Sequence, residues 1–600
     1  MMAVVSKRDI KSQLLTVVRG ARAVCVGLGY SLLVLAAGLA LWGWLVCESS
    51  IFEGQWNPFD RVQNYYWRHN FPGGPAATLL VAVAALIGVS VYAWLRRGRL
   101  ADHVVRASAT LAVLYFAILS FGLPAFYHLV MGNFPVTSSV PLVVAAWLLA
   151  LAGAAALLAA TPMADLTRRA LPIVIGGVVV GVIAAVVLAV FAVQAGDDGR
   201  YINATVAPST DLPAAPTKLG QRRFTVKVSE WAGNPANQPD FQVASAGAGF
   251  VTFHHGQVTG YGGDGKERWH YRRSGPGRVA TYGLRVFDDG RTVVVAQNAG
   301  PDGQARVLVG LDAVTGREIW SERSTLPDPE ANSFDPHLNM HGIERREPSP
   351  FLIANRSSDT SAWTRFDTRT GKPMWTVDSP VGHGCSGRVA DTESLIVTAT
   401  ACSANGNANV GVVLQDPRSG KQVWQATLAE NIPDRPDQRF DIHATPAGRD
   451  GIEIAYGPAN APTNRVYVNV LSHNLRDLGP DDRIAASTEP GDVFVMQHQQ
   501  QPDVTQLSLY GTNGVQRCGL SPDLKLRTAL FGDYDLYLPL YGDAVFYDTT
   551  AHALQTVDAN TCAAHGTQPV SAATNWLDAA PGLVWLQRVE RDGTYVDGYS

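Results

Sequence analysis

Apolar residues are concentrated in the first third of this 600-residue chain, where they form five continuous runs. Each run is long enough to cross a bilayer as a helix, which takes about 20 residues. The first run is too long for a signal peptide, and four more follow it. The pattern therefore predicts a five-helix transmembrane domain over residues 24–195, with spans at 24–46, 76–95, 107–129, 140–160 and 171–193.

Basic residues flank these runs unevenly, and this asymmetry predicts the orientation of the helices. Loops rich in Lys and Arg remain in the cytoplasm. Such residues precede the first run, separate the second from the third, and separate the fourth from the fifth: Lys7, Arg8, Lys11, Arg19, Arg22, Arg96, Arg97, Arg99, Arg106, Arg168 and Arg169. We therefore expect a cytoplasmic tail at residues 1–23 and a bacterial plasma membrane location. Everything after the fifth run should lie outside the cytoplasm.

Beyond residue 223 the pattern changes to short alternating or β-branched segments, such as 292–296 and 394–398, which are typical of strands. Eight strand-rich units can be counted, and the last of them is short. The alternating segment 224–231 is expected to complete that unit and to close a ring, which removes open sheet edges. The prediction is a β-propeller of eight blades over residues 223–600, with seven blades as the alternative, joined to the helices by a linker at 196–222.

One motif recurs in this region every 40 to 60 residues, a period that is typical of propeller blades. An Asp, a Gly four residues later and a Trp four residues after that occur at Asp312, Gly316 and Trp320, at Asp367, Gly371 and Trp375, and at Asp416, Gly420 and Trp424. Gly265 and Trp269 keep only the last two positions, and Gly514 is followed by Cys518 where the Trp would stand.

The residue types of the motif indicate a structural role. Glycine accepts the positive φ that a tight turn needs. The Asp can accept hydrogen bonds from the turn backbone, and a Trp wedged between blades can bury about 200 Å². We interpret the motif as blade docking, which by itself identifies no cofactor.

The motif resembles the tryptophan-docking repeat of pyrroloquinoline-quinone (PQQ) -type propellers. That family includes quinoprotein dehydrogenases and cofactor-free relatives such as the propeller lipoprotein of outer-membrane assembly. Five spans followed by an external propeller also resemble the layout of membrane-bound quinoprotein glucose dehydrogenase, although no motif is matched. The resemblance implies a propeller over about 224–600 and leaves catalysis open.

Cysteine positions support an oxidising location for the strand-rich region. Cys25 and Cys47 lie at the two ends of the first apolar run, about 33 Å apart on a helix, too far for a disulfide. The other four permit three pairings: Cys385, Cys402, Cys518 and Cys562. We favour Cys385–Cys402 and Cys518–Cys562, because each pair lies within one repeat or across adjacent repeats; four buried free thiols are the alternative. Disulfides require an oxidising compartment.

Charge and composition exclude some classes of function. The formal net charge is −4, and no basic block with interleaved aromatics indicates nucleic acid binding. The spans contain almost no ionisable side chains, which argues against an ion-coupled transporter. The Ala-, Val-, Gly- and Arg-rich usage suits an actinobacterium.

Two functions from different classes fit these observations. The first is a non-catalytic propeller on a membrane anchor, presenting a binding surface to envelope proteins or components, with no cofactor or metal. The alternative is a membrane-bound dehydrogenase that holds PQQ and Ca²⁺ and passes electrons from a sugar or alcohol to membrane quinone. The ligand set for PQQ and calcium cannot be assembled at a recognisable spacing, and the vicinal cysteine pair of some such enzymes is absent. The first function is therefore preferred.

Two further features carry weaker hypotheses. His337 and His341, with Asp335 and Glu344, have the spacing of metal ligands on a helix, but a loop containing Pro and Asn is a poor host for one. The loop at 48–74 is crowded with aromatic residues. It is interpreted either as an interfacial segment or as a docking surface for the outer domain, a lipid or a partner.

Overall fold

The computed structural model describes residues 7–45, 73–96, 99–133, 139–161, 170–230, 241–254, 256–273, 281–288, 290–299, 305–324, 351–356, 361–378, 380–381, 385–392, 394–404, 406–434, 440–447, 450–458, 464–487, 493–501, 504–511, 513–520, 537–540, 542–548 and 551–600. The chain divides into a helical unit that ends at Ile202 and a β-rich unit that begins at Asn203.

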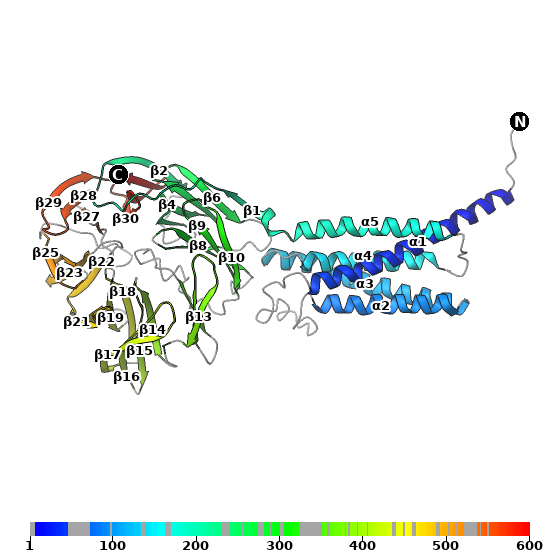
Figure 1. Ribbon diagram of the computed structural model, residues 1–600, viewed down its shortest axis with the longest axis horizontal. Coiled ribbons are helices and arrows are strands. Elements are labelled where there is room, and N and C mark those ends of the chain that lie inside the picture. Colours follow the sequence, from blue (N-terminus) through cyan, green and yellow to red (C-terminus); the bar gives the residue numbers. More distant parts are fainter. Residues whose placement is uncertain are drawn as a thin grey trace. The chain divides into compact units, whose positions relative to one another are not determined.

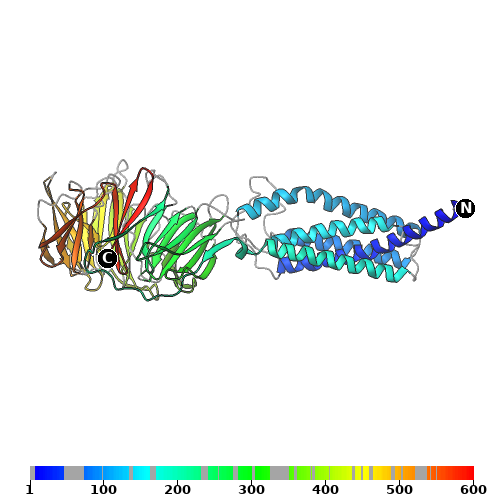
Figure 2. The ribbon, with the colours of Figure 1, turned by 90° about the horizontal axis from the view of Figure 1, so that it is seen from above.

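The helical unit contains long apolar helices that run side by side (Figure 2). They are α1 (Lys7–Leu45), α2 (Gly73–Arg96), α3 (Arg99–Asn133), α4 (Ser139–Ala160) and α5 (Leu171–Ala195), followed by the 3-10 helix η4 (Asp198–Tyr201). Within the described residues, α1, α3, α4 and α5 each hold an apolar segment long enough to cross a membrane. The corresponding segment of α2, Ala76–Tyr92, is shorter. The unit thus offers four to five helices for membrane anchoring.

Glycines allow α1 to approach α5 closely. A Cβ atom added at Gly177 would lie 2.2 Å from the carbonyl oxygen of Val24, and one added at Gly27 would lie 2.0 Å from that of Val174. At Gly181 it would lie 2.0 Å from Ser31 Oγ. The small-residue pair Gly177 and Gly181 therefore lies at a helix–helix contact, as small residues do in membrane proteins.

The strands of the β-rich unit, as far as they are described, form eight antiparallel sheets that follow one another around a ring (Figure 1). Sheet 1 contains β1 (Ile202–Thr205), β3 (Gln242–Ala246), β4 (Gly249–His254), β5 (Gln257–Gly262) and β6 (Glu267–Arg273); sheet 2 contains β7 (Thr281–Phe287), β8 (Thr292–Ala299), β9 (Ala305–Asp312) and β10 (Glu318–Ser324); sheet 3 contains β11 (Phe351–Arg356), β12 (Ser361–Phe366) and β13 (Pro373–Asp378); sheet 4 contains β14 (Cys385–Asp391), β15 (Ile396–Ala404), β16 (Asn407–Gln415) and β17 (Gln422–Pro433).

The other four sheets continue the series. Sheet 5 contains β18 (Phe440–Pro446), β19 (Gly451–Pro458), β20 (Asn464–Asn469) and β21 (Asn474–Asp477); sheet 6 contains β22 (Asp482–Ser487), β23 (Val493–Gln501), β24 (Val504–Gly511) and β25 (Gln516–Gly519); sheet 7 contains β26 (Tyr537–Pro539), β27 (Asp543–Asp548), β28 (Ala553–Asp558) and β29 (Ala564–Pro569); sheet 8 contains β30 (Thr574–Ala580), β31 (Leu583–Glu590), β32 (Gly593–Tyr599) and β2 (Arg222–Ser229).

Strand β2 completes the last sheet, as the alternating segment 224–231 predicts. It pairs antiparallel with β32, so that Val226 lies opposite Val596 and the order is β2-β32-β31-β30. The C-terminal strand is thereby held by a strand from the start of the unit (Figure 1). This pairing covers an edge of β32 that would otherwise present unpaired backbone groups.

The hydrophobic core of this unit is divided into clusters that lie between successive sheets. One cluster joins sheets 4 and 5 through residues such as Val412 and Ile454, and another joins sheets 8 and 1 through Trp585 and Phe250. Further clusters lie between sheets 5 and 6, 6 and 7, and 7 and 8. Stability of the unit therefore depends on how each sheet contacts the next one.

Candidate functional site: the inter-sheet docking contacts

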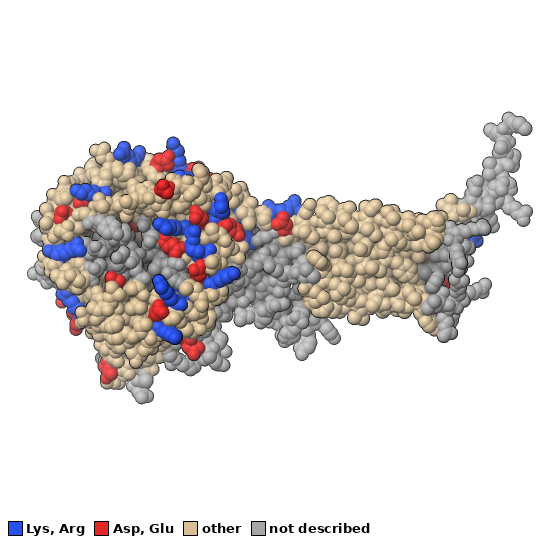
Figure 3. Space-filling model, in the orientation of Figure 1, with Lys and Arg blue, Asp and Glu red and all other residues tan. Residues whose placement is uncertain are grey.

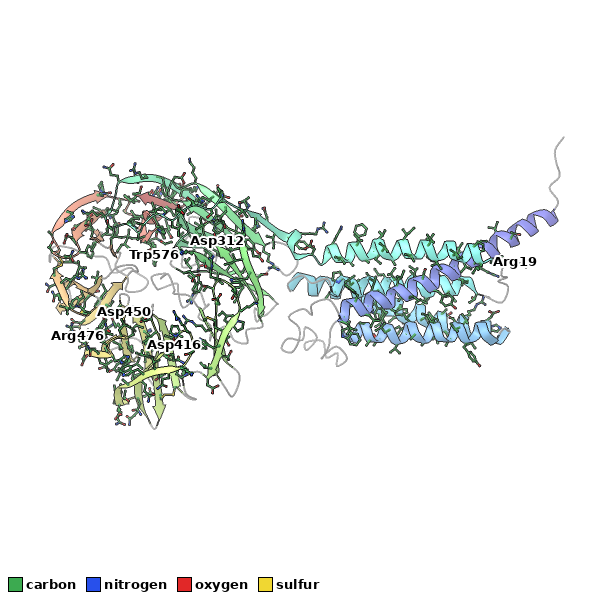
Figure 4. All side chains as sticks on the ribbon, viewed as in Figure 1. Arg19, Asp312, Asp416, Asp450, Arg476 and Trp576 are labelled. Carbon is green, nitrogen blue, oxygen red and sulfur yellow. A yellow bond between two sulfur atoms is a disulfide. The ribbon has the colours of Figure 1, made fainter. Side chains whose placement is uncertain are left out.

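The Asp of each full repeat organises the turn before the outermost strand. Asp367 Oδ1 accepts hydrogen bonds from the backbone N–H of Thr370 at 2.8 Å and from its hydroxyl at 2.8 Å. Asp312 makes the same two bonds with Thr315, both at 2.9 Å. The Gly that follows, for example Gly371 with φ 67°, takes the left-handed conformation that glycine adopts without strain. Figure 4 labels Asp312 and Asp416, the first residues of two such turns.

The Trp of each repeat lies against the turn of the next sheet. Its indole N–H donates to the carbonyl of the residue after the next Asp: Trp269 to Ala313 at 3.0 Å, Trp320 to Thr368 at 2.7 Å and Trp375 to Pro417 at 2.9 Å. The ring also covers the next glycine. A Cβ atom added at Gly316 or Gly371 would lie 2.5 Å from the indole of Trp269 or Trp320, and one at Gly420 would lie 2.9 Å from Trp375.

The pairing register of the outermost strand shifts just before each Trp. In sheet 2, Glu318 lies opposite Leu311 and Trp320 opposite Gly310, so that Ile319 is the extra residue of a β-bulge. Sheets 1, 3 and 4 contain the same irregularity before Trp269, Trp375 and Trp424. Because a bulge bends the strand and re-aims its side chains, the four-residue spacing from Gly to Trp encodes both the turn and the bulge.

Two further junctions use other residue types, and in the second of them the ring comes from another position, Tyr467 of β20. At the junction of sheets 4 and 5, Trp424 stacks on the His473 ring with centroids 5.0 Å apart. His473 occupies the glycine position with φ 58°, in a turn whose first residue, Asn469, accepts bonds from the N–H and hydroxyl of Ser472. At the next junction, the Tyr467 ring lies 3.2 Å from a Cβ atom added at Gly514. Burial raises the pKa of Tyr467 to about 12.

A disulfide replaces the indole at the junction of sheets 6 and 7. Cys518 stands at the Trp position after Gly514, and it is bonded to Cys562. Cys562 occupies the glycine position of the next turn with φ 55°. The first residue of that turn, Asp558, accepts bonds from Thr561 N–H at 2.8 Å and from its hydroxyl at 3.0 Å. These bonds, the Thr561 backbone bond first, lower the pKa of the Asp558 carboxyl. The contact made by ring packing elsewhere is covalent here.

The sequence pattern missed the turns at 469–473 and 558–562 because both lack the glycine. The usable signal was an Asn or Asp followed three residues later by Ser or Thr, which marks a turn closed by a side chain. The junction of sheets 8 and 1 was also unassigned. There the Phe224 ring covers Gly265, whose added Cβ would lie 2.5 Å away.

The segment 203–221, which we name the strap, hydrogen-bonds to several sheets. Ala207 N–H donates to Thr315 O at 2.9 Å in sheet 2, and Gly582 N–H of sheet 8 donates to Ala214 O at 2.8 Å. Gly542 N–H of sheet 7 donates to Thr217 O at 3.1 Å. Most of the predicted linker 196–222 is thus part of the β-rich unit, where it bridges sheets 7 and 8 to sheets 1 and 2.

Both favoured disulfides are present. Cys385–Cys402 joins directly opposed residues of β14 and β15, with Cα atoms 4.1 Å apart, and Cys518–Cys562 joins sheets 6 and 7. Cys25 is a free cysteine, and Cys47 lies outside the described residues.

Several other sequence hypotheses fall on residues that the structure does not describe. Asp335, His337, His341 and Glu344 lie outside the described residues, as does most of the aromatic loop 48–74. Among the residues that are described, no group of three or more His, Cys, Asp or Glu is arranged to hold a metal ion.

The fold and these contacts define a protein with apolar helices followed by an all-β region that resembles propellers and is built from PQQ-type docking repeats. Residues 209–335 and 254–447 match the family model described as outer membrane protein assembly factor BamB. The three full repeats lie within these matched residues and are similar to the repeats of that family. No curated protein matches the chain.

Solved structures that align with this chain include BamB, a quinohemoprotein alcohol dehydrogenase and the Dos1 propeller. BamB from Moraxella catarrhalis is 13% identical, with 64% of this chain and 98% of that chain covered and a TM-score of 0.35. Quinohemoprotein alcohol dehydrogenase ADHIIG from Pseudomonas putida HK5 is 10% identical, with 63% and 76% covered and a TM-score of 0.36. The Dos1 propeller is 10% identical, with 64% and 95% covered and a TM-score of 0.35.

Proposed function

We propose that this chain is an integral membrane protein whose β-rich unit is a non-catalytic, extracytoplasmic scaffold for proteins or components of the cell envelope. In this proposal five helices span a bacterial plasma membrane, residues 1–23 are cytoplasmic, and the eight sheets are the eight blades of one closed propeller over 223–600. The bilayer and an envelope protein are the partners, and neither PQQ nor calcium is required.

The proposal rests on the contacts that the Asp, Trp and Cys residues of the repeats make. The Asp carboxylates close turns, the indoles of Trp269, Trp320 and Trp375 donate to carbonyls of the next sheet, and Cys518 is bonded to Cys562. These side chains are thus engaged in holding sheet to sheet, and a rigid ring of this kind suits a broad binding surface. The matching family model, described as an assembly factor, agrees with this role.

The location outside the cytoplasm rests on two independent features. Disulfides persist in oxidising compartments, and the β-rich unit contains two. By the positive-inside rule, the Lys and Arg residues that flank the apolar runs support a cytoplasmic N-terminal side.

The proposal and the dehydrogenase alternative predict different spectra. Full-length protein is purified in detergent, and its visible absorbance and calcium content are measured before and after addition of PQQ and calcium. The scaffold proposal predicts no quinone chromophore, no tight uptake of PQQ and no turnover of a sugar or alcohol. It also predicts a stoichiometric envelope partner after cross-linking in intact cells. A bound, substrate-reducible chromophore would establish the dehydrogenase instead.

A further inference from the structure

A cavity of about 400 Å³ lies where the strap passes the docking turns of sheets 2 and 3. Thr210, Asp211 and Leu212 of the strap form one wall. The other walls are Arg291 from the turn between β7 and β8, Asp312 and Val314 from the turn between β9 and β10, and Arg369 from the turn between β12 and β13. Four separate parts of the chain therefore bring two guanidinium groups and two carboxylates to one cavity.

The charged groups of this cavity are incompletely paired with one another. The side chains of Arg291 and Asp211 make no hydrogen bond or ion pair with any described residue. Arg369 Nη1 lies 4.0 Å from Asp312 Oδ2 and 3.4 Å from Thr292 Oγ1, which are long distances for such contacts. Asp312 uses its other oxygen, Oδ1, to close its own turn. Asp211, Arg291 and Arg369 are exposed, so charged groups of both signs are available to a ligand at the cavity.

Hydrogen bonds between neighbouring residues hold the two turns that bear Arg291 and Arg369. Thr368, next to Arg369, donates its hydroxyl to both carboxylate oxygens of Asp288, at 2.9 and 2.8 Å, and Thr292 donates to Asp288 Oδ2 at 2.6 Å. Trp320 donates to the carbonyl of Thr368. Basic and acidic residues are interleaved on the visible face over the region of β8–β10 (Figures 1 and 3). The two arginines therefore project from turns that are already held in place.

We propose that this cavity binds a small zwitterionic ligand that carries a carboxylate and an ammonium group, such as a short peptide with free ends. A purely anionic ligand would be repelled by the carboxylates of Asp211 and Asp312, and a purely cationic ligand would be repelled by the two guanidinium groups. A ligand with both charges pairs its carboxylate with Arg291 and Arg369 and its ammonium with Asp211 and Asp312. Leu212 and Val314 supply apolar contact between the charged ends. This site goes beyond the scaffold role and does not depend on it.

The test uses full-length protein in detergent and titration calorimetry with three probes that share one dipeptide and differ in which end is charged. Alanyl-alanine is a zwitterion, N-acetyl-alanyl-alanine lacks the ammonium group, and alanyl-alanine amide lacks the carboxylate. We expect saturable binding of alanyl-alanine and at least tenfold weaker binding of each capped form. Absence of saturable binding of alanyl-alanine, or equal binding of all three probes, would overturn the proposal.

Two variants assign each charge to its partner. Arg291→Gln should weaken alanyl-alanine binding at least fivefold and reduce the preference for alanyl-alanine over its amide, with Arg369 still present. Asp211→Asn should reduce the preference for alanyl-alanine over the N-acetyl form, with Asp312 still present. Arg418→Gln is the matched control, because Arg418 holds the position of Arg369 in the next repeat and does not line the cavity. All three variants should keep the wild-type unfolding profile. An equal loss of binding in Arg418→Gln would contradict the assignment.

Discussion

The Cys518–Cys562 disulfide can be exchanged for the Trp–Gly pair that docks the other sheets. The variant Cys518→Trp/Cys562→Gly places the indole and the glycine at the repeat positions that they occupy in sheets 1 to 4. Its reference is Cys518→Ser/Cys562→Gly, which has neither the disulfide nor the ring. If the disulfide substitutes for an indole wedge, restoring the wedge should recover stability that the reference loses.

The magnitudes follow from the separation and backbone of the two cysteines. They lie 44 positions apart, and in the chain-entropy model closing a loop of that size stabilises the folded state by about 4 kcal/mol. Cys562→Gly removes a left-handed non-glycine residue, which returns about 1 kcal/mol. The reference variant should therefore lose about 3 kcal/mol. A buried Trp contributes about 3 to 5 kcal/mol relative to Ala, and imperfect packing costs about 1 to 3 kcal/mol, so the wedge variant should recover about 2 kcal/mol.

The assay must report locally, because a chain with a helical unit and a β-rich unit is not expected to unfold in one step. Hydrogen exchange of the backbone amides of β25 and β29 in the full-length protein measures opening at this junction. The predicted order of protection is wild type, then the wedge variant, then the reference. Equal protection in the wedge variant and the reference would refute the equivalence of disulfide and indole, and wild-type protection in the reference would show that the disulfide does not fasten the two sheets.

Three further predictions concern single positions in the β-rich unit. Gly371→Ala should destabilise its turn by clearly more than Gly479→Ala does, since both glycines have positive φ but only Gly371 is covered by an indole. Hydrogen exchange of the strand after each turn should show a loss of about 1 kcal/mol for Gly479→Ala, and equal losses in the two variants would contradict ring docking. Glu453→Ala should cost about 3 to 5 kcal/mol, because Glu453 pairs with the largely buried Arg465 and accepts a bond from Ile484 N–H of the next sheet. Unchanged exchange protection of β19 and β22 would contradict this role of Glu453. Because the pKa of Asp558 is lowered, the stability that its ionised carboxylate gives to the turn is present above the ordinary aspartate pKa and is lost as the pH falls through the lowered value. The exchange protection factor of the Thr561 amide should fall over the same pH range in the wild type. In Asp558→Asn it should not change with pH.

The regular repeats were predictable because their chemistry is visible in residue types. Gly316, Gly371 and Gly420 take positive φ, and a Trp four residues later lies on the turn of the following sheet or, for Trp424, on His473. The pairing of Cys518 with Cys562 followed from their places in adjacent repeats, and the alternation of segment 224–231 predicted the strand that pairs with β32.

Other features left no comparable trace in the sequence. The turn at His473 and the turn at Cys562 place side chains where glycine is expected, so a search based on glycine passes over them. The strap contributes mainly backbone carbonyls, which any residue possesses, and its prolines indicate a linker as readily as a bound segment. The first strand of sheet 4, β14, has polar or charged residues on both faces, so it lacks the alternation that marks a half-buried strand. The cavity depends on turns far apart in the sequence, and only the fold brings them together.

Cysteine labelling in intact cells with a membrane-impermeant maleimide tests on which side of the membrane the β-rich unit lies. Lys421→Cys introduces a thiol on an exposed docking turn of sheet 4, and Arg19→Cys introduces one on the exposed first part of α1; the wild type gives the background of native thiols. An extracytoplasmic propeller predicts that Lys421→Cys is labelled in intact cells, whereas Arg19→Cys is labelled only after the cells are permeabilised. Labelling of Arg19→Cys in intact cells, with Lys421→Cys protected until permeabilisation, would contradict the account.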